Sequence, residues 1–287
     1  MLRPGARVAV ISPSGISNPE RLWRGIAELE AWGFRPELLP HARREHRYLA
    51  GTDAERASDL FRAFSGDYDA VWMARGGYGL SRLVGNVNWE ELAPVPFFGF
   101  SDGTVLLNAL AARGRPAIHA PVLHALASHN DEATRTWLRA LLHGHAEAWF
   151  PARTVRAGEA EGRLVGGNLC VLATLCGTPL QLDARGAVVL LEDLGEVPYK
   201  LDRLLVQLRD SGALAGARAI LLGDFLDAAP PPGAPWTLDE VFAEVLGPLR
   251  IPIVAGLPIG HGRTNLAVPL GVPVHVGPGG VTLGRPR

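Results

Sequence analysis

Short apolar runs alternate with amphipathic segments along the first half of the chain. Buried-strand patterns lie at Arg7–Ser12, Arg35–Leu39, Ala70–Ala74, Pro96–Phe100 and Ala117–His119. Between them, apolar side chains recur at helical spacing from Ser17-Asn18-Pro19-Glu20 to Gly33, over Thr52–Phe64 and over Thr104–Ala112. Ser17 and Glu20 have the spacing of a capping box. Strands that alternate with helices in this way predict an α/β fold with a parallel sheet covered on both faces.

The second half of the chain has shorter apolar runs and more Pro and Gly. Helices are predicted over Asn168–Leu175, Asp202–Asp210 and Thr237–Leu246, and strands over Ala187–Leu191, Ala219–Gly223 and Ile253–Ala255, with Val-rich strands at the end. We interpret residues 1–125 as an N-terminal α/β domain, 126–160 as a linker and 161–287 as a smaller mixed α/β domain. The length of 287 residues suits two domains, with one large α/β domain as the alternative.

Composition and charge narrow the class of protein. Apolar residues make up 47% of the chain and charged residues 20%, so a sizeable hydrophobic core is available. The net charge is −1, so no surplus of basic residues points to nucleic-acid binding. No apolar run reaches about 18 residues and no signal-peptide pattern follows Met1, so we expect a cytoplasmic protein that does not bind membranes. Cys170 and Cys176 are interpreted as buried thiols. No His, Cys and Asp have metal-ligand spacing, and no cofactor is expected.

Gly99-Phe100-Ser101-Asp102-Gly103 is the sharpest local motif. It fits Gly-x-Ser-x-Gly and lies between a predicted strand and a predicted helix. A nucleophile on such a tight turn is exposed, flanking glycines let the backbone bend, and the helix N-terminus supplies free N–H groups for an oxyanion. Ser101 is therefore a candidate nucleophile. The alternative is that Ser101 caps an ordinary helix.

A serine nucleophile needs a base and a carboxylate that orients the base. Among nine His residues, His261 stands apart because it lies in a glycine-flanked loop after a strand, although a His bonded to loop backbone would fit the same pattern. Glu192 follows the buried run Ala187–Leu191, at the sheet edge where α/β sites form. Its alternative role is a cap or a salt bridge to Lys200 or Arg203.

Two glycine-rich segments expose backbone N–H groups. Arg75-Gly76-Gly77-Tyr78-Gly79 follows a predicted strand, and Gly166-Gly167-Asn168 is predicted to be a turn before the Cys-containing helix. The first segment does not fit a nucleotide fingerprint. Arg75 is a candidate clamp for a carboxylate, with a structural ion pair as the alternative. Tyr78, Gly167 and Asn168 are further candidates for substrate binding.

These motifs, in this order, resemble the LD-carboxypeptidase family of serine peptidases. The resemblance is carried by five main segments and spans about residues 8–270: Val10–Gly15, Ala74–Gly79, Gly99–Asp102, Gly166–Leu169 and Leu191–Asp193. Further matches are Glu196 through Asp202-Arg203, and Gly260-His261 with Asn265 and Pro269. The segment between Ser101 and Glu192 looks compact, and Ala120 stands where Gly is expected. Both departures lie outside the proposed triad.

The resemblance implies a cytosolic enzyme that releases D-alanine from a murein tetrapeptide during cell-wall recycling. It implies a flavodoxin-like or amidotransferase-like N-terminal domain, a swivelling-type C-terminal domain and a homodimer. By the same resemblance, Ser101 is the nucleophile, His261 the base and Glu192 the orienting carboxylate. Backbone N–H groups of Asp102 and of Gly76 or Gly77 then form the oxyanion hole.

Two alternatives stay open. A microcin-immunity carboxypeptidase cleaves a peptide–nucleotide or aminoacyl–nucleotide amide, and an aromatic slot for the nucleobase is expected from it, for which the Trp149 and Trp236 loops are candidates. A ligand-binding α/β protein without catalysis is the other alternative, and the presence of candidates for all three triad positions counts against it.

Overall fold

The computed structural model describes residues 2–85, 87–144 and 148–284. It divides into two compact units, which do not correspond to a single cut in the sequence. Unit 1 takes Met1–His145 together with Arg263–Pro269, and unit 2 takes Ala146–Gly262 together with Leu270–Arg287. The segment 126–160, interpreted as a linker above, contains one helix of unit 1 and two strands of unit 2.

Unit 1 is built on a six-stranded sheet with the order β12-β5-β4-β3-β1-β2. The five strands that carry the predicted apolar runs pair in parallel. They are β1 (Arg7–Ile11), β2 (Arg35–Leu38), β3 (Ala70–Met73), β4 (Phe97–Gly99) and β5 (Ala117–His119), with β12 (Val268–Leu270) at the edge. Because parallel strands end at the same edge of a sheet, the loops after β1, β3, β4 and β5 all begin there.

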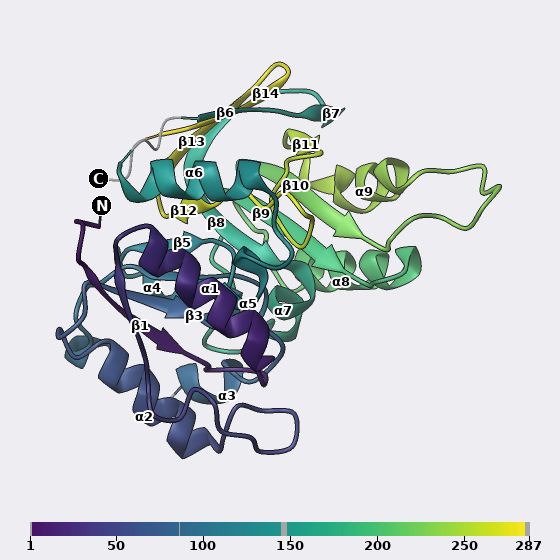
Figure 1. Cartoon of the computed structure of the whole chain (residues 1–287). Helices are drawn as coiled ribbons and strands as arrows, with labels where there is room; N and C mark the ends of the chain where they lie inside the picture. Colours follow the sequence, from purple (N-terminus) through teal and green to yellow (C-terminus); the bar gives the residue numbers. More distant parts are fainter. Residues whose placement is uncertain (1, 86, 145–147, 285–287) are drawn as a thin grey trace. The chain divides into compact units, whose positions relative to one another are not determined.

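The helices of unit 1 occupy the segments between these strands (Figure 1). They are α1 (Pro19–Ala31), α2 (Asp53–Ala63), α3 (Ser81–Val84), α4 (Thr104–Ala111), α5 (Leu123–Leu126) and α6 (Glu132–Leu142), with 3₁₀ turns η1 (Trp89–Glu91) and η2 (Ser101–Gly103). The predicted Ser17–Glu20 capping box is wrong. Asn18 is the N-cap of α1 and accepts from the Arg21 N–H at 3.0 Å, because Pro19 favours the first helical position. Thr52 and Glu55 do form a capping box on α2.

Unit 2 contains an eight-stranded mixed sheet with the order β6-β14-β13-β8-β9-β10-β11-β7. Its centre is parallel, from β8 to β11, and its flanks are antiparallel. The strands are β6 (Ala148–Pro151), β7 (Arg153–Arg156), β8 (Ala160–Asn168), β9 (Ala187–Leu194), β10 (Ala219–Leu226), β11 (Ile253–Ala255), β13 (Pro273–Gly277) and β14 (Gly280–Leu283). The mixed α/β fold in two parts, predicted from the sequence, is therefore confirmed.

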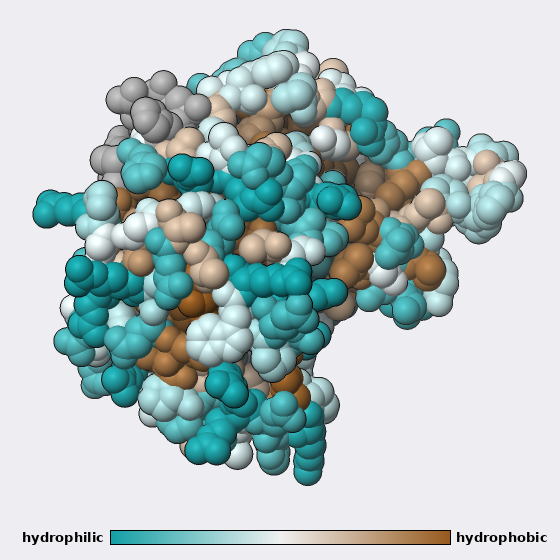
Figure 2. Space-filling view, in the orientation of Figure 1, coloured by the Kyte–Doolittle hydropathy of each residue, from teal (hydrophilic) through white to brown (hydrophobic). Residues whose placement is uncertain are grey.

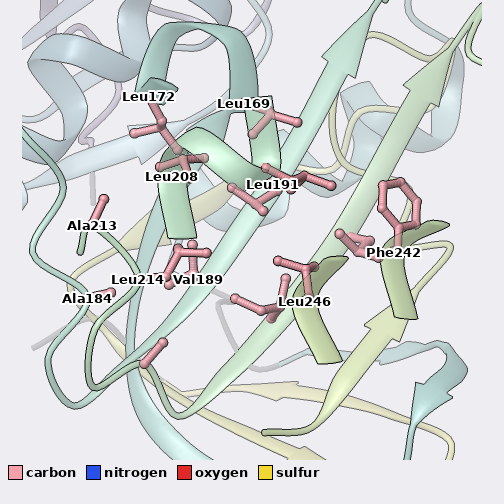
Figure 3. Packing of buried hydrophobic residues seen from close by; sticks show 14 of the residues in the cluster. Leu169, Leu172, Ala184, Val189, Leu191, Leu208, Ala213, Leu214, Phe242 and Leu246 are labelled. Carbon is pink, nitrogen blue, oxygen red and sulfur yellow. The ribbon is translucent and has the colours of Figure 1, made fainter. Parts of the chain in front are cut away.

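The helices of unit 2 close one hydrophobic core over β9 and β10. They are α7 (Leu169–Thr174), α8 (Pro198–Asp210) and α9 (Leu238–Leu246), with the 3₁₀ turn η3 (Gly247–Leu249) after α9. Leu208 of α8 and Phe242 of α9 belong to the same cluster of buried side chains as Val189 and Leu191 of β9 (Figure 3). These side chains are at most 2% exposed, so the core holds β9 in place up to its last buried residues.

The predicted turn at Gly166-Gly167-Asn168 is also wrong. These residues end strand β8 and pair with β9, Asn168 lying opposite Glu192. Gly166 and Gly167 have φ of 111° and 135°, and a Cβ on Gly166 would lie 2.1 Å from the carbonyl oxygen of Leu190. Glycine is needed because neighbouring strands approach closely at this point.

Hydrophilic residues cover most of the face shown in Figure 2, with smaller apolar areas between them. Among the residues that the structure describes, no helix is long and apolar enough to cross a membrane.

Candidate active site

Ser101 lies on a sharp turn between β4 and α4. Phe100 is extended, Ser101 has a φ of 60°, and the turn η2 leads directly into Thr104. A left-handed conformation is unfavourable for a residue with a Cβ, and it costs of order 1–3 kcal/mol that the surrounding structure must offset. The geometry matches the strained strand-to-helix turn that exposes a nucleophile. An ordinary N-cap role is not seen, because no side-chain cap bond opens α4 among the described residues.

The glycine loop after β3 lies directly against Ser101. A Cβ built on Gly76 would be 2.9 Å from the Ser101 Cβ and 3.0 Å from its Oγ, so only glycine fits here. The Gly76 carbonyl accepts from the Gly15 N–H at 3.0 Å. Gly77 has a φ of 110°, which also favours glycine. The structure therefore brings the predicted Gly76 backbone next to the Ser101 hydroxyl, while Gly77 lies against Gly15.

The buried Asp102 side chain stabilises the Ser101 turn and the glycine loop through hydrogen bonds. It is 3% exposed, and its Oδ2 accepts from the Ser14 hydroxyl at 2.5 Å and from the Leu80 N–H at 2.9 Å. Burial raises the pKa of Asp102, although these hydrogen bonds and nearby Arg56 favour the ionised form. One carboxylate thus ties together the loop after β1, the glycine loop and the serine turn.

Arg56 of α2 supports the same loops from the interior. Its side chain is fully buried and donates to the carbonyls of Pro13 and Gly79, the latter at 3.1 Å, while it pairs with Asp53. A buried guanidinium needs such partners, because removing the charge from water is costly. This residue was not identified from the sequence, since a lone Arg in a helix gives no signal of burial.

Arg75 and Tyr78 are exposed on the glycine loop. Arg75 donates to the Ile16 carbonyl and pairs with no carboxylate among the described residues, so the structural ion pair considered above is not found there. Tyr78 is 49% exposed, and its ring centroid lies 6.3 Å from that of Tyr48.

In unit 2, the structure brings Glu192 and His261 together although 69 residues separate them. Glu192 lies near the end of β9 with no exposure, and its Oε2 is 2.7 Å from Nδ1 of His261. A carboxylate can only accept, so Nδ1 carries the proton and Nε2 the lone pair. A Cβ on Gly260 would lie 2.9 Å from Glu192 Oε2, so the glycine before His261 permits this approach. Among the described residues, Glu192 forms no salt bridge to Lys200 or Arg203, and Lys200 pairs with Glu196 at 3.5 Å.

The environment of His261 favours its protonated form. Burial lowers the pKa of His261, but the hydrogen bond and charge of Glu192, with Asp193 and Asp224 further away, outweigh burial and raise the pKa overall. The imidazole is therefore a stronger base than an isolated histidine.

Asn168 and Asp193 organise the start of α7 beside Glu192. The Asn168 side chain caps α7 by accepting from the Val171 N–H at 3.0 Å, and its amide donates to Asp193 Oδ1 at 3.2 Å. Asp193 Oδ2 accepts from the Cys170 N–H at 2.8 Å. Asp193 therefore supports the start of α7 together with Asn168, whereas the Glu192 carboxylate binds His261. Gly167 lies next to Asn168 and pairs with Leu191.

Sequence reasoning missed Asp224, which holds the loop of His261. Its Oδ2 accepts from the Gly262 N–H at 3.1 Å, and its own N–H donates to the Ile259 carbonyl at 2.9 Å. Burial raises the pKa of Asp224 to about 6, and the charge of Glu192 adds to the shift. The signal was present, since Asp224 follows a buried strand as Glu192 does. Within the described part of the chain, no three His, Cys, Asp or Glu side chains are grouped as metal ligands.

Two family profiles match this chain, one in each half. The profile of the LD-carboxypeptidase N-terminal domain matches residues 8–120, which contain Ser101 and the Gly76-Gly77 loop. The profile of the LD-carboxypeptidase C-terminal domain matches residues 161–276, which contain Glu192 and His261. The chain belongs to the LD-carboxypeptidase family. It is a serine-type carboxypeptidase, a hydrolase of peptide bonds.

Relatives of this LD-carboxypeptidase cover nearly its whole length. The murein tetrapeptide carboxypeptidase of Pseudomonas aeruginosa is 37% identical over 92% of this chain and 91% of its own. The crystal structure of muramoyltetrapeptide carboxypeptidase from Oxalobacter formigenes matches with a TM-score of 0.87 and 28% identity, over 96% of this chain and 97% of that one. The microcin C7 self-immunity protein of Escherichia coli is 24% identical over 91% of this chain and 86% of its own.

Proposed function

We propose that this LD-carboxypeptidase hydrolyses the terminal L,D-peptide bond of a murein tetrapeptide and releases D-alanine. The observation that carries the catalytic part is Ser101, held at a φ of 60° with its hydroxyl against the Gly76 backbone. The names of the Pseudomonas and Oxalobacter relatives support the substrate class. A protein without catalysis is excluded by membership of the family.

The proposed reaction begins with proton transfer. Nε2 of His261 accepts the Ser101 hydroxyl proton while Glu192 stabilises the resulting imidazolium through Nδ1. Ser101 Oγ then attacks the carbonyl carbon of the L,D-peptide bond. Negative charge develops on the carbonyl oxygen, and the N–H groups of Asp102 and of Gly76 or Gly77 are proposed to bind it.

The intermediate collapses when His261 protonates the nitrogen of the leaving D-amino acid. The acyl group stays on Ser101 until His261 activates a water that releases it and restores the enzyme. No step in this sequence needs a metal ion or an organic cofactor.

A direct assay separates the proposed substrate from its alternative. Purified enzyme, with a chelator present, is expected to release D-alanine from an L-Lys or diaminopimelate tetrapeptide. The same enzyme is tested on an aminoacyl–nucleotide amide, the chemistry of the microcin-immunity alternative. Preference for the nucleotide substrate would overturn the murein assignment while leaving the serine chemistry intact.

The aromatic side chains named for that alternative are both exposed in unit 2. Trp149 lies in β6 and is 60% exposed, and Trp236 lies before α9 and is 37% exposed. The cytoplasmic location, the role in cell-wall recycling, the homodimer and the domain limits 1–125 and 161–287 stay predictions.

A further inference from the structure

Two arginines of unit 1 lie near the half-buried imidazole of His124, beside the glycine loop. Arg21, in the first turn of α1, places Nη1 3.4 Å from Nε2 of His124. The His124 N–H donates to the Ala74 carbonyl at 2.9 Å, immediately before Arg75. Burial first, and then the charges of Arg75 and Arg21, lower the pKa of His124 to about 4. The imidazole is therefore neutral at neutral pH, and two positive charges surround it.

Neither guanidinium is paired with a carboxylate in the part of the chain that the structure describes. Within the described ranges, Arg21 and Arg75 form no ion pair, and Glu20, the acidic group nearest to Arg21 in sequence, pairs with Arg24 at 2.6 Å. Both arginines are exposed. A cation in the first turn of a helix is also unfavourable, because the positive end of the helix dipole lies there. An uncompensated pair of this kind favours an anionic ligand.

Arg75 of this pair directly precedes the glycine loop that is proposed to bind the oxyanion. Arg75 precedes Gly76, and the Gly76 backbone contacts Ser101. Arg75 uses Nη1 to bind the Ile16 carbonyl, which fixes the guanidinium and leaves Nε and Nη2 with no recorded partner in the described structure. A fixed guanidinium with two parallel N–H groups fits a carboxylate in two-point contact.

We propose that Arg75, assisted by Arg21, binds the free α-carboxylate of the terminal D-amino acid. This inference rests on the proposed function. In a substrate with a scissile terminal bond, the carboxylate carbon lies within about 4 Å of the carbonyl carbon that Ser101 attacks, because consecutive backbone units are that far apart. A carboxypeptidase must recognise this group in order to reject internal peptide bonds. The neutral His124 imidazole near both arginines adds no charge to this site.

The test compares two tetrapeptides that differ only at the C-terminus, one with a free carboxylate and one with an amide. Arg75→Gln keeps an N–H for the Ile16 carbonyl but removes the charge. We expect it to lower kcat/KM for the acid by about 10- to 100-fold, as expected for loss of a charged hydrogen bond. The value for the amide should stay within about twofold of wild type. Arg21→Gln should have the same selectivity with a smaller effect, and Arg75→Lys should recover part of the loss.

Arg24→Ala is the matched control, because Arg24 is exposed on the same helix and pairs only with Glu20 in the described structure. It should leave both substrates unchanged. Binding of both tetrapeptides to the Ser101→Ala variant gives a second readout without turnover, and Arg75→Gln in that background should weaken binding of the acid alone.

Equal losses for acid and amide in Arg75→Gln would overturn the carboxylate site while leaving the proposed function standing. If the wild-type enzyme cleaves neither tetrapeptide, the proposed function is overturned, and the carboxylate site with it.

Discussion

Replacing Gly76 by Ala tests the contact between the glycine loop and Ser101. The new methyl group would lie 2.9 Å from the Ser101 Cβ and 3.0 Å from its Oγ, whereas ordinary contacts begin at 3.4 Å, so at least 0.5 Å (3.4 minus 2.9) of movement is required. Overpacking of this kind costs about 1–3 kcal/mol of stability. A displaced nucleophile loses more activity than stability, since about 1 Å of misplacement can reduce turnover roughly 100-fold.

We therefore expect Gly76→Ala to lower kcat for D-alanine release by roughly 10- to 100-fold. Unfolding in urea should show a loss of about 1–3 kcal/mol. Gly85→Ala is the matched control, because Gly85 follows α3, has a φ of −63°, and has no described heavy atom within 4 Å of its Cβ position. It should preserve kcat and raise stability by about 0.4–1 kcal/mol. A Gly76→Ala enzyme with kcat within twofold of wild type and unchanged stability would refute the proposed placement of the serine hydroxyl.

Three further substitutions test the supports of the site. Glu192→Gln removes the charge that raises the pKa of His261 against the lowering effect of burial. The acid limb of the pH profile of kcat/KM should therefore move to lower pH, and kcat should fall about 10²- to 10⁴-fold. An acid limb at the wild-type pH would contradict this. Asp102→Ala leaves the buried Ser14 hydroxyl and Leu80 N–H without their acceptor, so the free energy of unfolding in denaturant should fall by about 2–6 kcal/mol. Asp102→Asn should lose less, because the amide oxygen of Asn can accept both hydrogen bonds. Equal losses in the two variants would count against the role of the Asp102 carboxylate in joining these loops. Burial, with Glu192, raises the pKa of Asp224 to about 6, so ionisation of Asp224 reduces the stability of the wild type as pH rises from about 4 to 6. Asp224→Asn lacks this ionisation, so thermal melts should show its stability relative to wild type to be greater at pH 7 than at pH 4. A difference between variant and wild type that does not change with pH would contradict the shift.

Local sequence was sufficient for the elements that hold the nucleophile. The apolar runs at Ala70–Ala74 and Pro96–Phe100 became β3 and β4, and the Gly-x-Ser-x-Gly motif became the turn between β4 and α4. Each of these features depends on residues that are adjacent in sequence. The carboxylate at the end of the Ala187–Leu191 run was likewise found by position, and the structure pairs it with the predicted histidine.

Several features that depend on distant partners were not predicted. Strand β8 was not predicted because its first residues are mostly polar and its last residues include Gly166 and Gly167, a pair that is typical of a turn. Only the pairing with β9 shows that these glycines belong to a strand. Arg56 and Asp102 are charged residues that are usually exposed, and their burial follows from loops that meet only in the fold. The return of Arg263–Pro269 to unit 1 also depends on a long-range strand pairing.

The central claim is that Ser101 is the nucleophile of a carboxypeptidase acting on an L,D-peptide bond. The most direct measurement is the rate of D-alanine release from a murein tetrapeptide by wild-type enzyme and by Ser101→Ala, with thermal melts to verify that both are folded. We predict release by wild type and a fall of at least about 10³-fold in the folded variant. D-alanine release by Ser101→Ala within tenfold of wild type would contradict the claim.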